Sequence, residues 1–349
     1  MKLLRRFRRS PRPVTVITGF LGSGKTTLIN HLLAQPAMAG AAVIVNELGA
    51  VPLDHLLVER VDERMAVLSS GCLCCSLRGD LVETLLDLDQ RAKKRTIPAF
   101  DRVIVETTGL ADPAPVLHAL MAPQGVRGRF RLGGVVTVVD AELGVATLGA
   151  HPEAVKQIAV ADVVVINKTD RADAGPVEAA VRGLNPRATL VRAERGEVAV
   201  DSVVIDDGYA DERAVPDIAD WLGEGPAASS HDHDHPDDPR GTSTFHGDVV
   251  TTCLIRDEPL DGALLTDWIR LMVAEHGDDL LRVKGIVNVE GRPGPALLHG
   301  VQHVFHPVRW LGAWPDADRR TRIVCIARGI QPETLERSLD AVLGRPLRS

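Results

Sequence analysis

Aromatic side chains are scarce in this 349-residue sequence, because phenylalanine, tryptophan and tyrosine together make up only 3% of it. Proteins that bind single-stranded nucleic acid stack bases on aromatic side chains, and this composition leaves little material for such a surface. An excess of positive charge is missing as well, since 47 acidic residues outnumber 40 basic ones and the formal net charge is -7. We therefore expect no nucleic-acid partner.

The sequence also has no apolar run near the roughly 20 residues that a membrane-spanning helix requires. No apolar stretch typical of a secretory signal follows the basic residues within positions 2–12. Cysteine is rare, five in all, and three of the five fall within positions 72–75. Such spacing is unlike a disulfide framework and indicates a local thiolate site in a reducing compartment. We expect a cytoplasmic protein without membrane contact.

The first part of the chain has the hydrophobic pattern of a layered α/β domain. Short apolar strands rich in β-branched residues alternate with helical patterns, and strands that are apolar on both faces are typical of a mostly parallel sheet with helices on both sides. The predicted strands fall at 14–18, 42–46, 101–106, 133–140 and 161–167. We assign residues 1–13 to a basic tail and 14–205 to this domain.

The chain changes character after residue 205. Residues 206–243 are acidic and rich in Gly, Pro and Ser, which is typical of an exposed linker. Residues 244–349 predict a smaller α+β domain, with a helical stripe at Leu260, Leu264, Trp268, Leu271 and Met272. Near residue 284, apolar residues alternate with Arg282 and Lys284, which predicts a half-solvated strand. A last helix is expected to begin at Pro332.

A phosphate-loop motif follows the first strand. Residues 19–26 read Gly-Phe-Leu-Gly-Ser-Gly-Lys-Thr and match G-x-x-x-x-G-K-[ST] between a strand and a helix. In such a loop the backbone N–H groups surround the β-phosphate, Lys25 reaches the β and γ oxygens, and the Thr26 hydroxyl binds Mg²⁺. The alternative is a glycine-rich turn with an exposed lysine. The predicted phosphate-binding residues are Gly19, Gly22, Ser23, Gly24, Lys25, Thr26 and Thr27.

A second motif follows the strand at 161–167, where Asn167, Lys168 and Asp170 form an N-K-x-D string. A carboxylate accepts hydrogen bonds from the N1–H and N2 amine of guanine, whereas adenine offers no matching pair of donors. The motif favours GTP over ATP and argues against a kinase for a small substrate. The alternative is an ordinary charged turn at the end of a strand.

Glu106 ends a third strand and is followed by Thr107, Thr108 and Gly109. A carboxylate there can hold Mg²⁺ through water, and Gly109 can offer its N–H to the γ-phosphate. With Lys25 and Thr26, Glu106 completes the predicted catalytic set, and residues 109–113 are a candidate switch. No residue is evident that would orient the attacking water. A solvated strand-end glutamate is the alternative.

Cys72, Cys74 and Cys75 form a C-x-C-C loop before the helix predicted near residue 78. Thiolates bind Zn²⁺ and other late transition metals, and two or three ligands on one loop leave a coordination position open for transfer. A redox pair and inert buried cysteines are the alternatives.

Together these strings resemble the CobW family of P-loop GTPases. The resemblance rests on GFLGSGKTTLINHLL, NELG, GCLCCSLRGDL, ETTGLADPAPV, QIAVADVVVINKTD and VKGIVNVEGRPGPALLHGVQHVFHP, and it spans nearly all residues beyond 13. It implies a P-loop NTPase-like α/β domain followed by a CobW-type C-terminal domain. It also implies a GTP-hydrolysing metallochaperone or metal insertase that binds zinc or a similar ion at the cysteines and serves a client protein. Dimerisation through the nucleotide face is common in this class and is a further expectation.

One departure concerns residue 50, which is alanine where many relatives carry a second acidic residue, although Glu47 remains as a candidate metal ligand. In the linker, His231, His233 and His235 can collect a metal ion at neutral pH or belong to a merely solvated segment. His303 and His306 match the C-terminal pattern of the family, and we interpret them as packing residues.

Two alternative functions remain beside the metallochaperone. One is a cobalt-directed accessory GTPase, although a cobalt site is expected to use more N or O ligands than C-x-C-C supplies. The other is a metal buffer or sensor that binds GTP as a conformational ligand and has no dedicated client. The alternatives differ in whether a client accelerates hydrolysis and receives metal.

Overall fold

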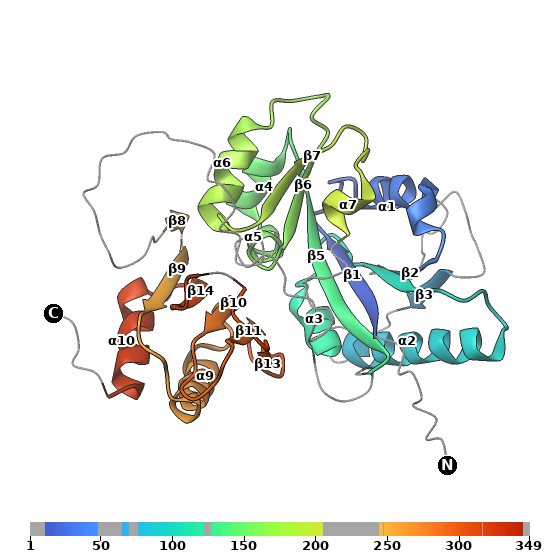
Figure 1. The fold of residues 1–349 in the computed structure, drawn as a ribbon. Coiled ribbons are helices and arrows are strands. Elements are labelled where there is room, and N and C mark those ends of the chain that lie inside the picture. The colour runs from blue at the N-terminus through green and yellow to red at the C-terminus, as the bar shows by residue number, and fades with distance from the viewer. Residues whose placement is uncertain are drawn as a thin grey trace, which may run out of the picture.

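The computed structural model describes residues 11–47, 65–69, 76–121, 126, 128–204, 244–246, 248–315 and 317–344. These residues build two sheets, each with its own helices (Figure 1). We call residues 11–204 the first domain and 244–344 the C-terminal domain. No helix in the described ranges is long and apolar enough to cross a membrane.

The first domain contains a parallel sheet with the strand order β3-β2-β4-β1-β5-β6-β7. All five predicted strands are present, which confirms the predicted mostly parallel sheet. The strands are β1 (Arg12–Thr18), β2 (Ala41–Glu47), β3 (Met65–Ser69), β4 (Arg102–Glu106), β5 (Phe130–Asp140), β6 (Val163–Asn167) and β7 (Thr189–Arg192).

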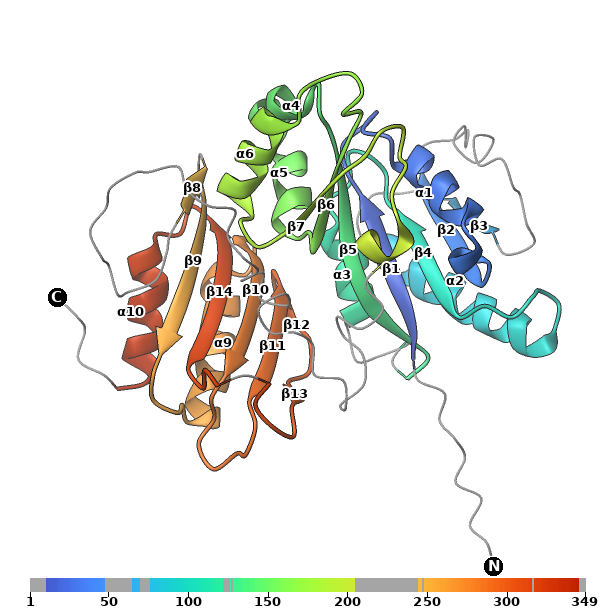
Figure 2. The same cartoon turned by 45° about the horizontal axis from the view of Figure 1, so that its top comes forward.

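Helices cover both faces of this sheet because the strands are apolar on both sides. One face packs against α1 and α7, and the other against α2, α3, α5 and α6. The helices are α1 (Lys25–Ala34), η1 (Pro36–Met38), α2 (Ser76–Lys94), α3 (Ala114–Met121), α4 (Gly144–Ala150), α5 (Pro152–Ala159), α6 (Gly175–Leu184) and α7 (Val200–Val203). In Figure 2 the carboxyl ends of the strands lie at the top of the first domain, where β1 leads into α1.

β1 begins earlier than predicted. Arg12 is its first residue, and its guanidinium contacts the Asp89 carboxylate at 2.9 Å and lies 4.5 Å from the centre of the Phe100 ring. Asp89 is only 2% exposed. Arg12 is therefore a paired residue of the sheet and not part of a solvated tail. A buried carboxylate is unfavourable unless a cation lies beside it, and Arg12 supplies that cation.

The C-terminal domain is an antiparallel sheet with the order β12-β11-β10-β14-β9-β8, and β13 also pairs with β11. Two helices pack on one face (Figure 2). The elements are β8 (Thr244–His246), β9 (Val249–Arg256), α9 (Gly262–His276), β10 (Leu280–Val287), β11 (Ala296–Val301), β12 (Val304–Phe305), β13 (Arg309–Trp310), β14 (Thr321–Arg328) and α10 (Pro332–Val342). The predicted last helix begins at Pro332 as expected.

The buried face of α9 differs from the predicted stripe. Leu265, Trp268 and Met272 are buried, whereas Leu264 and Leu271 are only partly buried. Leu260 lies before the helix and forms a bridge with Val289. Successive leucines at 264 and 265 made two helical faces possible, and packing against the sheet selects the face with Leu265.

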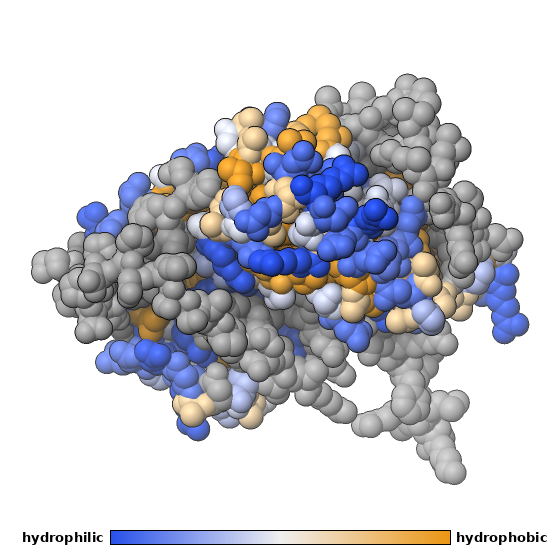
Figure 3. All heavy atoms as spheres, turned by 90° about the horizontal axis from the view of Figure 1, so that it is seen from above, coloured by the Kyte–Doolittle hydropathy of each residue, from blue (hydrophilic) through white to orange (hydrophobic). Residues whose placement is uncertain are grey.

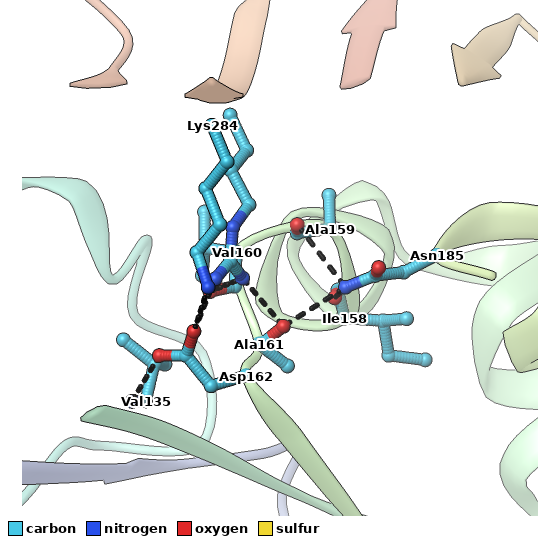
Figure 4. A network of polar contacts seen from close by, with 9 residues as sticks. Val135, Ile158, Ala159, Val160, Ala161, Asp162, Asn185 and Lys284 are labelled. Atoms are coloured by element: carbon cyan, nitrogen blue, oxygen red, sulfur yellow. Dashed lines mark hydrogen bonds and ion pairs between the residues drawn. The ribbon is translucent and has the colours of Figure 1, made fainter. Parts of the chain in front are cut away.

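The prediction of a half-solvated β10 is wrong. Arg282 is only 5% exposed and pairs with Asp162 of the first domain. Lys284 points toward the same carboxylate (Figure 4). Apolar residues of the C-terminal domain join the core around α5 and α6 at the same interface. The Thr251 hydroxyl donates to the Leu184 carbonyl at 3.0 Å, which adds a polar contact between the domains.

Candidate functional site

The phosphate-loop motif lies at the carboxyl edge of the first sheet, between β1 and α1. Gly19, Gly22 and Gly24 all have positive φ angles. Gly24 precedes α1 with φ 99°, and a Cβ built on it would lie 2.2 Å from the Asn167 amide nitrogen. The loop therefore requires glycine here both for its left-handed backbone and for the close approach of β6.

Lys25 and Thr26 begin α1, so the helix N-terminus presents them toward the loop. Lys25 is 8% exposed, and its ammonium donates to the Gly19 carbonyl at 2.8 Å and the Phe20 carbonyl at 3.2 Å. The Thr26 hydroxyl donates to Glu106 Oε1 at 2.9 Å. Glu106 ends β4, beside β1, and is 4% exposed. The start of α1 and the end of β4 thus bring Thr26 and Glu106 into contact, and Lys25 precedes Thr26 at the same helix N-terminus.

Asn167 holds two loops together at this edge. Its Nδ2 donates to the Ser23 carbonyl at 3.0 Å, and its Oδ1 accepts from the Gly196 N–H at 2.9 Å. The side chain is 2% exposed. Its amide therefore fixes the phosphate loop against the segment after β7, which the sequence reasoning did not foresee.

Lys168 and Asp170 line the open side of the same edge. Lys168 has φ 64° and contacts the Asp140 carboxylate at 2.6 Å. Burial raises the pKa of Asp140, but Lys168 and the backbone N–H groups of Glu142 and Leu143 outweigh it and hold that pKa below its ordinary value. Asp170 is 26% exposed, with Arg195 at 3.9 Å, and is accessible to a base.

Asp140 is a site residue that the motifs missed. A signal was present, because Asp140 closes a predicted apolar strand just as Glu106 and Asn167 do. Polar residues at the carboxyl ends of parallel strands meet at one edge of the sheet.

The segment after Glu106 lies against the phosphate loop. A Cβ built on Gly109 would lie 2.6 Å from the Leu21 backbone nitrogen, so no other residue fits without a shift of backbone. Gln157 of α5 donates from Nε2 to the Gly109 carbonyl at 3.2 Å and the Ala111 carbonyl at 3.1 Å. Lys156 pairs with Asp112 at 2.7 Å. Neither Lys156 nor Gln157 was predicted as a site residue.

A cavity of about 190 Å³ lies beside the phosphate loop, between it, the end of β5 and helices α4 and α5. Its lining combines apolar side chains with Asp140 and Lys168. Leu21 and Leu143 at its rim are 59% and 58% exposed. When the molecule is seen from above, hydrophobic residues on its surface form small groups between hydrophilic ones (Figure 3).

The predicted metal ligands lie mostly outside the described residues. These are Cys72, Cys74, Cys75, His231, His233 and His235, and the side chain of Glu47. Glu47 ends β2, opposite Ser69 at the end of β3. Within the described ranges, no three His, Cys, Asp or Glu side chains gather as a metal site.

A parallel sheet with a phosphate loop joining its first strand to its first helix places the chain in the P-loop NTPase class. Residues 13–192 match the family described as CobW/HypB/UreG, nucleotide-binding domain, and residues 249–343 match the family described as Cobalamin synthesis protein cobW C-terminal domain. The chain belongs to the CobW family, which confirms the resemblance drawn from the motifs.

Relatives of similar length share this arrangement. The chain is 30% identical over 323 residues to the zinc chaperone YjiA of Escherichia coli, covering 92% of this chain and 95% of the relative. It is 30% identical to the zinc chaperone CobW of Pseudomonas aeruginosa, covering 95% and 91%. The crystal structure of Zn(II)-bound YjiA GTPase from E. coli superposes with a TM-score of 0.70 and 24% identity, covering 98% of this chain and all of that one, and confirms the fold.

Proposed function

We propose that this protein is a GTP-hydrolysing metallochaperone that carries zinc and delivers it to a client protein. The observation that carries the proposal is the convergence of Lys25, the Thr26–Glu106 pair and the Asn167–Asp170 segment at one sheet edge. The chain is similar over nearly its whole length to proteins named zinc chaperones, which supports the metal.

The oxygen groups at Thr26 and Glu106 fit Mg²⁺. A hydroxyl and a nearly buried carboxylate lie 2.9 Å apart beside the phosphate loop, and Mg²⁺ prefers such hard oxygen ligands together with phosphate oxygens. Thr26 would bind the ion directly and Glu106 through water. When bound, Mg²⁺ neutralises charge on the β and γ phosphates.

The remaining residues of the site bind and position the nucleotide. Lys25 exchanges its two loop carbonyls for phosphate oxygens, and the loop N–H groups surround the β-phosphate. Gly109 offers its N–H to the γ-phosphate, and Asp170 accepts from guanine. A client or a second copy of the chain is the source we expect for the group that orients the attacking water.

Zinc is the cargo in this account. The C-x-C-C loop at 72–75 falls between the end of β3 at Ser69 and the start of α2 at Ser76, so both of its anchors belong to the domain that binds GTP. Thiolates favour zinc over cobalt. Glu47 and the histidines of the linker supply further ligands, and the chain works in the cytoplasm.

Nucleotide selectivity tests the proposal. Purified protein with Mg²⁺ is expected to hydrolyse GTP slowly and to bind it at least about tenfold more tightly than ATP, because only guanine offers paired donors to Asp170. Asp170→Ala removes this preference, and Thr26→Ala abolishes hydrolysis. Asp173→Ala is the matched control, since it removes an exposed carboxylate three residues further along. Equal binding of ATP and GTP by the unaltered protein would contradict the proposal.

A further inference from the structure

Helix α5 connects the loop that faces the γ-phosphate to the C-terminal domain. We propose that Gln157 is a positioning residue that holds the Gly109 segment in place, and that Arg282 of the C-terminal domain fixes the helix that carries Gln157. The inference rests on the proposed function, because it concerns the loop that contacts the third phosphate of GTP.

Gln157 is held as firmly as it holds the loop. It is fully buried, and its Nε2 uses both hydrogens on the carbonyls of Gly109 and Ala111. Its own backbone carbonyl accepts the Thr137 hydroxyl of β5 at 2.6 Å. A displacement of α5 would therefore move the Gln157 amide, and with it the carbonyl of Gly109.

The carboxyl end of α5, directly after Gln157, is bound from two sides. The last carbonyls of a helix lack partners within the helix, and a cation near them complements the helix dipole. Asn185 Nδ2 donates to the carbonyls of Ile158, Ala159 and Ala161, at 2.8, 3.4 and 3.0 Å (Figure 4). Arg282 Nη1 donates to the carbonyls of Val160 and Ala161, both at 2.5 Å. One of the two clamps therefore belongs to the C-terminal domain.

Arg282 is itself immobilised by charge. Its second terminal nitrogen contacts the Asp162 carboxylate, and Lys284 reaches the same oxygen at 2.7 Å. Asp162 also accepts the Val135 N–H of β5 at 2.9 Å, so the carboxylate is anchored to the sheet. Because all three charged side chains are largely buried, the C-terminal domain cannot move over α5 without breaking these contacts.

This chain of contacts predicts an effect confined to the triphosphate. GTP contacts the Gly109 N–H through its γ-phosphate, whereas GDP lacks that group and depends only on the phosphate loop and the guanine-binding residues. A change at Gln157 or Arg282 should therefore weaken binding of a GTP analogue and leave GDP binding intact. If these residues had a merely structural role, their replacement would weaken the binding of both nucleotides or of neither.

The experiment measures affinity for GDP and for a non-hydrolysable GTP analogue with Mg²⁺ in the full-length protein. Gln157→Met keeps the shape but removes the two donors, and is expected to weaken analogue binding about tenfold. Arg282→Met leaves the pair between Asp162 and Lys284 in place. This variant is expected to bind the GTP analogue about threefold more weakly. In the variant with both changes, the fold-loss of analogue affinity should be smaller than the product of the two single fold-losses, because both changes act on one loop.

Two further variants make the outcome interpretable. Arg282→Lys keeps the positive charge but lacks the planar guanidinium that reaches the carbonyls and the carboxylate together. It should weaken analogue binding as Arg282→Met does, and it tests the same contacts if Arg282→Met folds poorly. Arg256→Met breaks the ion pair of Arg256 with Asp340, 2.8 Å apart within the C-terminal domain, and should change neither affinity. Unchanged analogue-to-GDP ratios in the variants at 157 and 282 would overturn the inference, whereas an unaltered protein that binds neither nucleotide would overturn the proposed function instead.

Discussion

Asn167 and Asp170 belong to one motif, but their surroundings differ. Asn167 is buried and bonded on both sides to protein groups, the Ser23 carbonyl and the Gly196 N–H. Asp170 lies at the open edge, with the exposed Arg195 3.9 Å away. The asparagine therefore joins two loops at this edge, and we propose that the aspartate selects the base.

This difference predicts how Asn167→Ala behaves. The change leaves a buried carbonyl and a buried N–H without their partners, which costs about 1–3 kcal/mol of folding free energy. Because the phosphate loop serves both nucleotides, GDP and GTP should be weakened to the same extent. Urea denaturation and nucleotide titration check both results. Gln35→Ala is the control, since it removes an amide bonded to the Val198 carbonyl and should spare nucleotide affinity. Selective loss of GTP binding in Asn167→Ala would contradict the assignment.

Glu106 and Asn167 could be predicted because each is a polar residue that ends an apolar strand. Lys25 could be predicted from the glycine-rich motif that joins the first strand to a helix. Gln157 and Arg282 could not be predicted in the same way. Gln157 acts from within a helix, and Arg282 acts across a domain boundary, where sequence spacing carries no information about proximity.

At the scale of elements, β10 shows where patterning fails. Alternation of apolar and basic residues is typical of a strand with one solvent-exposed face, yet Arg282 and Lys284 contact the segment that leads from α5 into β6. A buried carboxylate supplied by another domain makes the basic residues interior ones. The parallel strands of the first sheet were predictable because their apolar character is continuous and does not depend on a distant partner.

The ion cluster between the domains predicts a large effect for Asp162→Asn. Burial alone would raise the pKa of Asp162, but the charges of Arg282 and Lys284 lower that pKa well below its ordinary value of 3.8. The change removes the negative charge that offsets the buried charges of Arg282 and Lys284, and it should cost about 3–5 kcal/mol near neutral pH. Denaturant unfolding measures this loss, and Asp267→Asn, which breaks an exposed pair with Arg270, should cost less than about 1 kcal/mol.

The sign of the pH dependence follows from the lowered pKa. A carboxyl whose folded-state pKa lies below its unfolded value contributes stability above pH 3.8, and this contribution is lost as the pH falls from 3.8 toward the lowered pKa. The gap in stability between the unaltered protein and Asp162→Asn should therefore narrow in that acidic range. A gap that stays constant down to the acid transition would show that the carboxylate charge is not the stabilising feature.

At the scale of the whole molecule, the nucleotide-binding domain contacts the C-terminal domain and also contains the loop with the three cysteines. The C-terminal domain holds the end of α5, the α5 side chains hold the segment after Glu106, and the loop at 72–75 begins after β3, whose carboxyl end lies at the same sheet edge as Glu106. We propose that one event, loss of the γ-phosphate, acts through this arrangement on both the domain interface and the loop that contains the three cysteines. By linkage, a metal that prefers one nucleotide state must change nucleotide affinity by the same factor.

We propose that the bound nucleotide, GDP or GTP, sets the affinity of this protein for zinc. It is tested most directly by chelator competition with the purified, reduced, full-length protein, in GDP and in a non-hydrolysable GTP analogue with Mg²⁺. A variant with Cys72, Cys74 and Cys75 replaced by serine serves as the control. The account predicts affinities that differ at least about tenfold, or about 1.4 kcal/mol of coupling, and loss of tight binding in the variant. Equal zinc affinities in the two nucleotide states would contradict it.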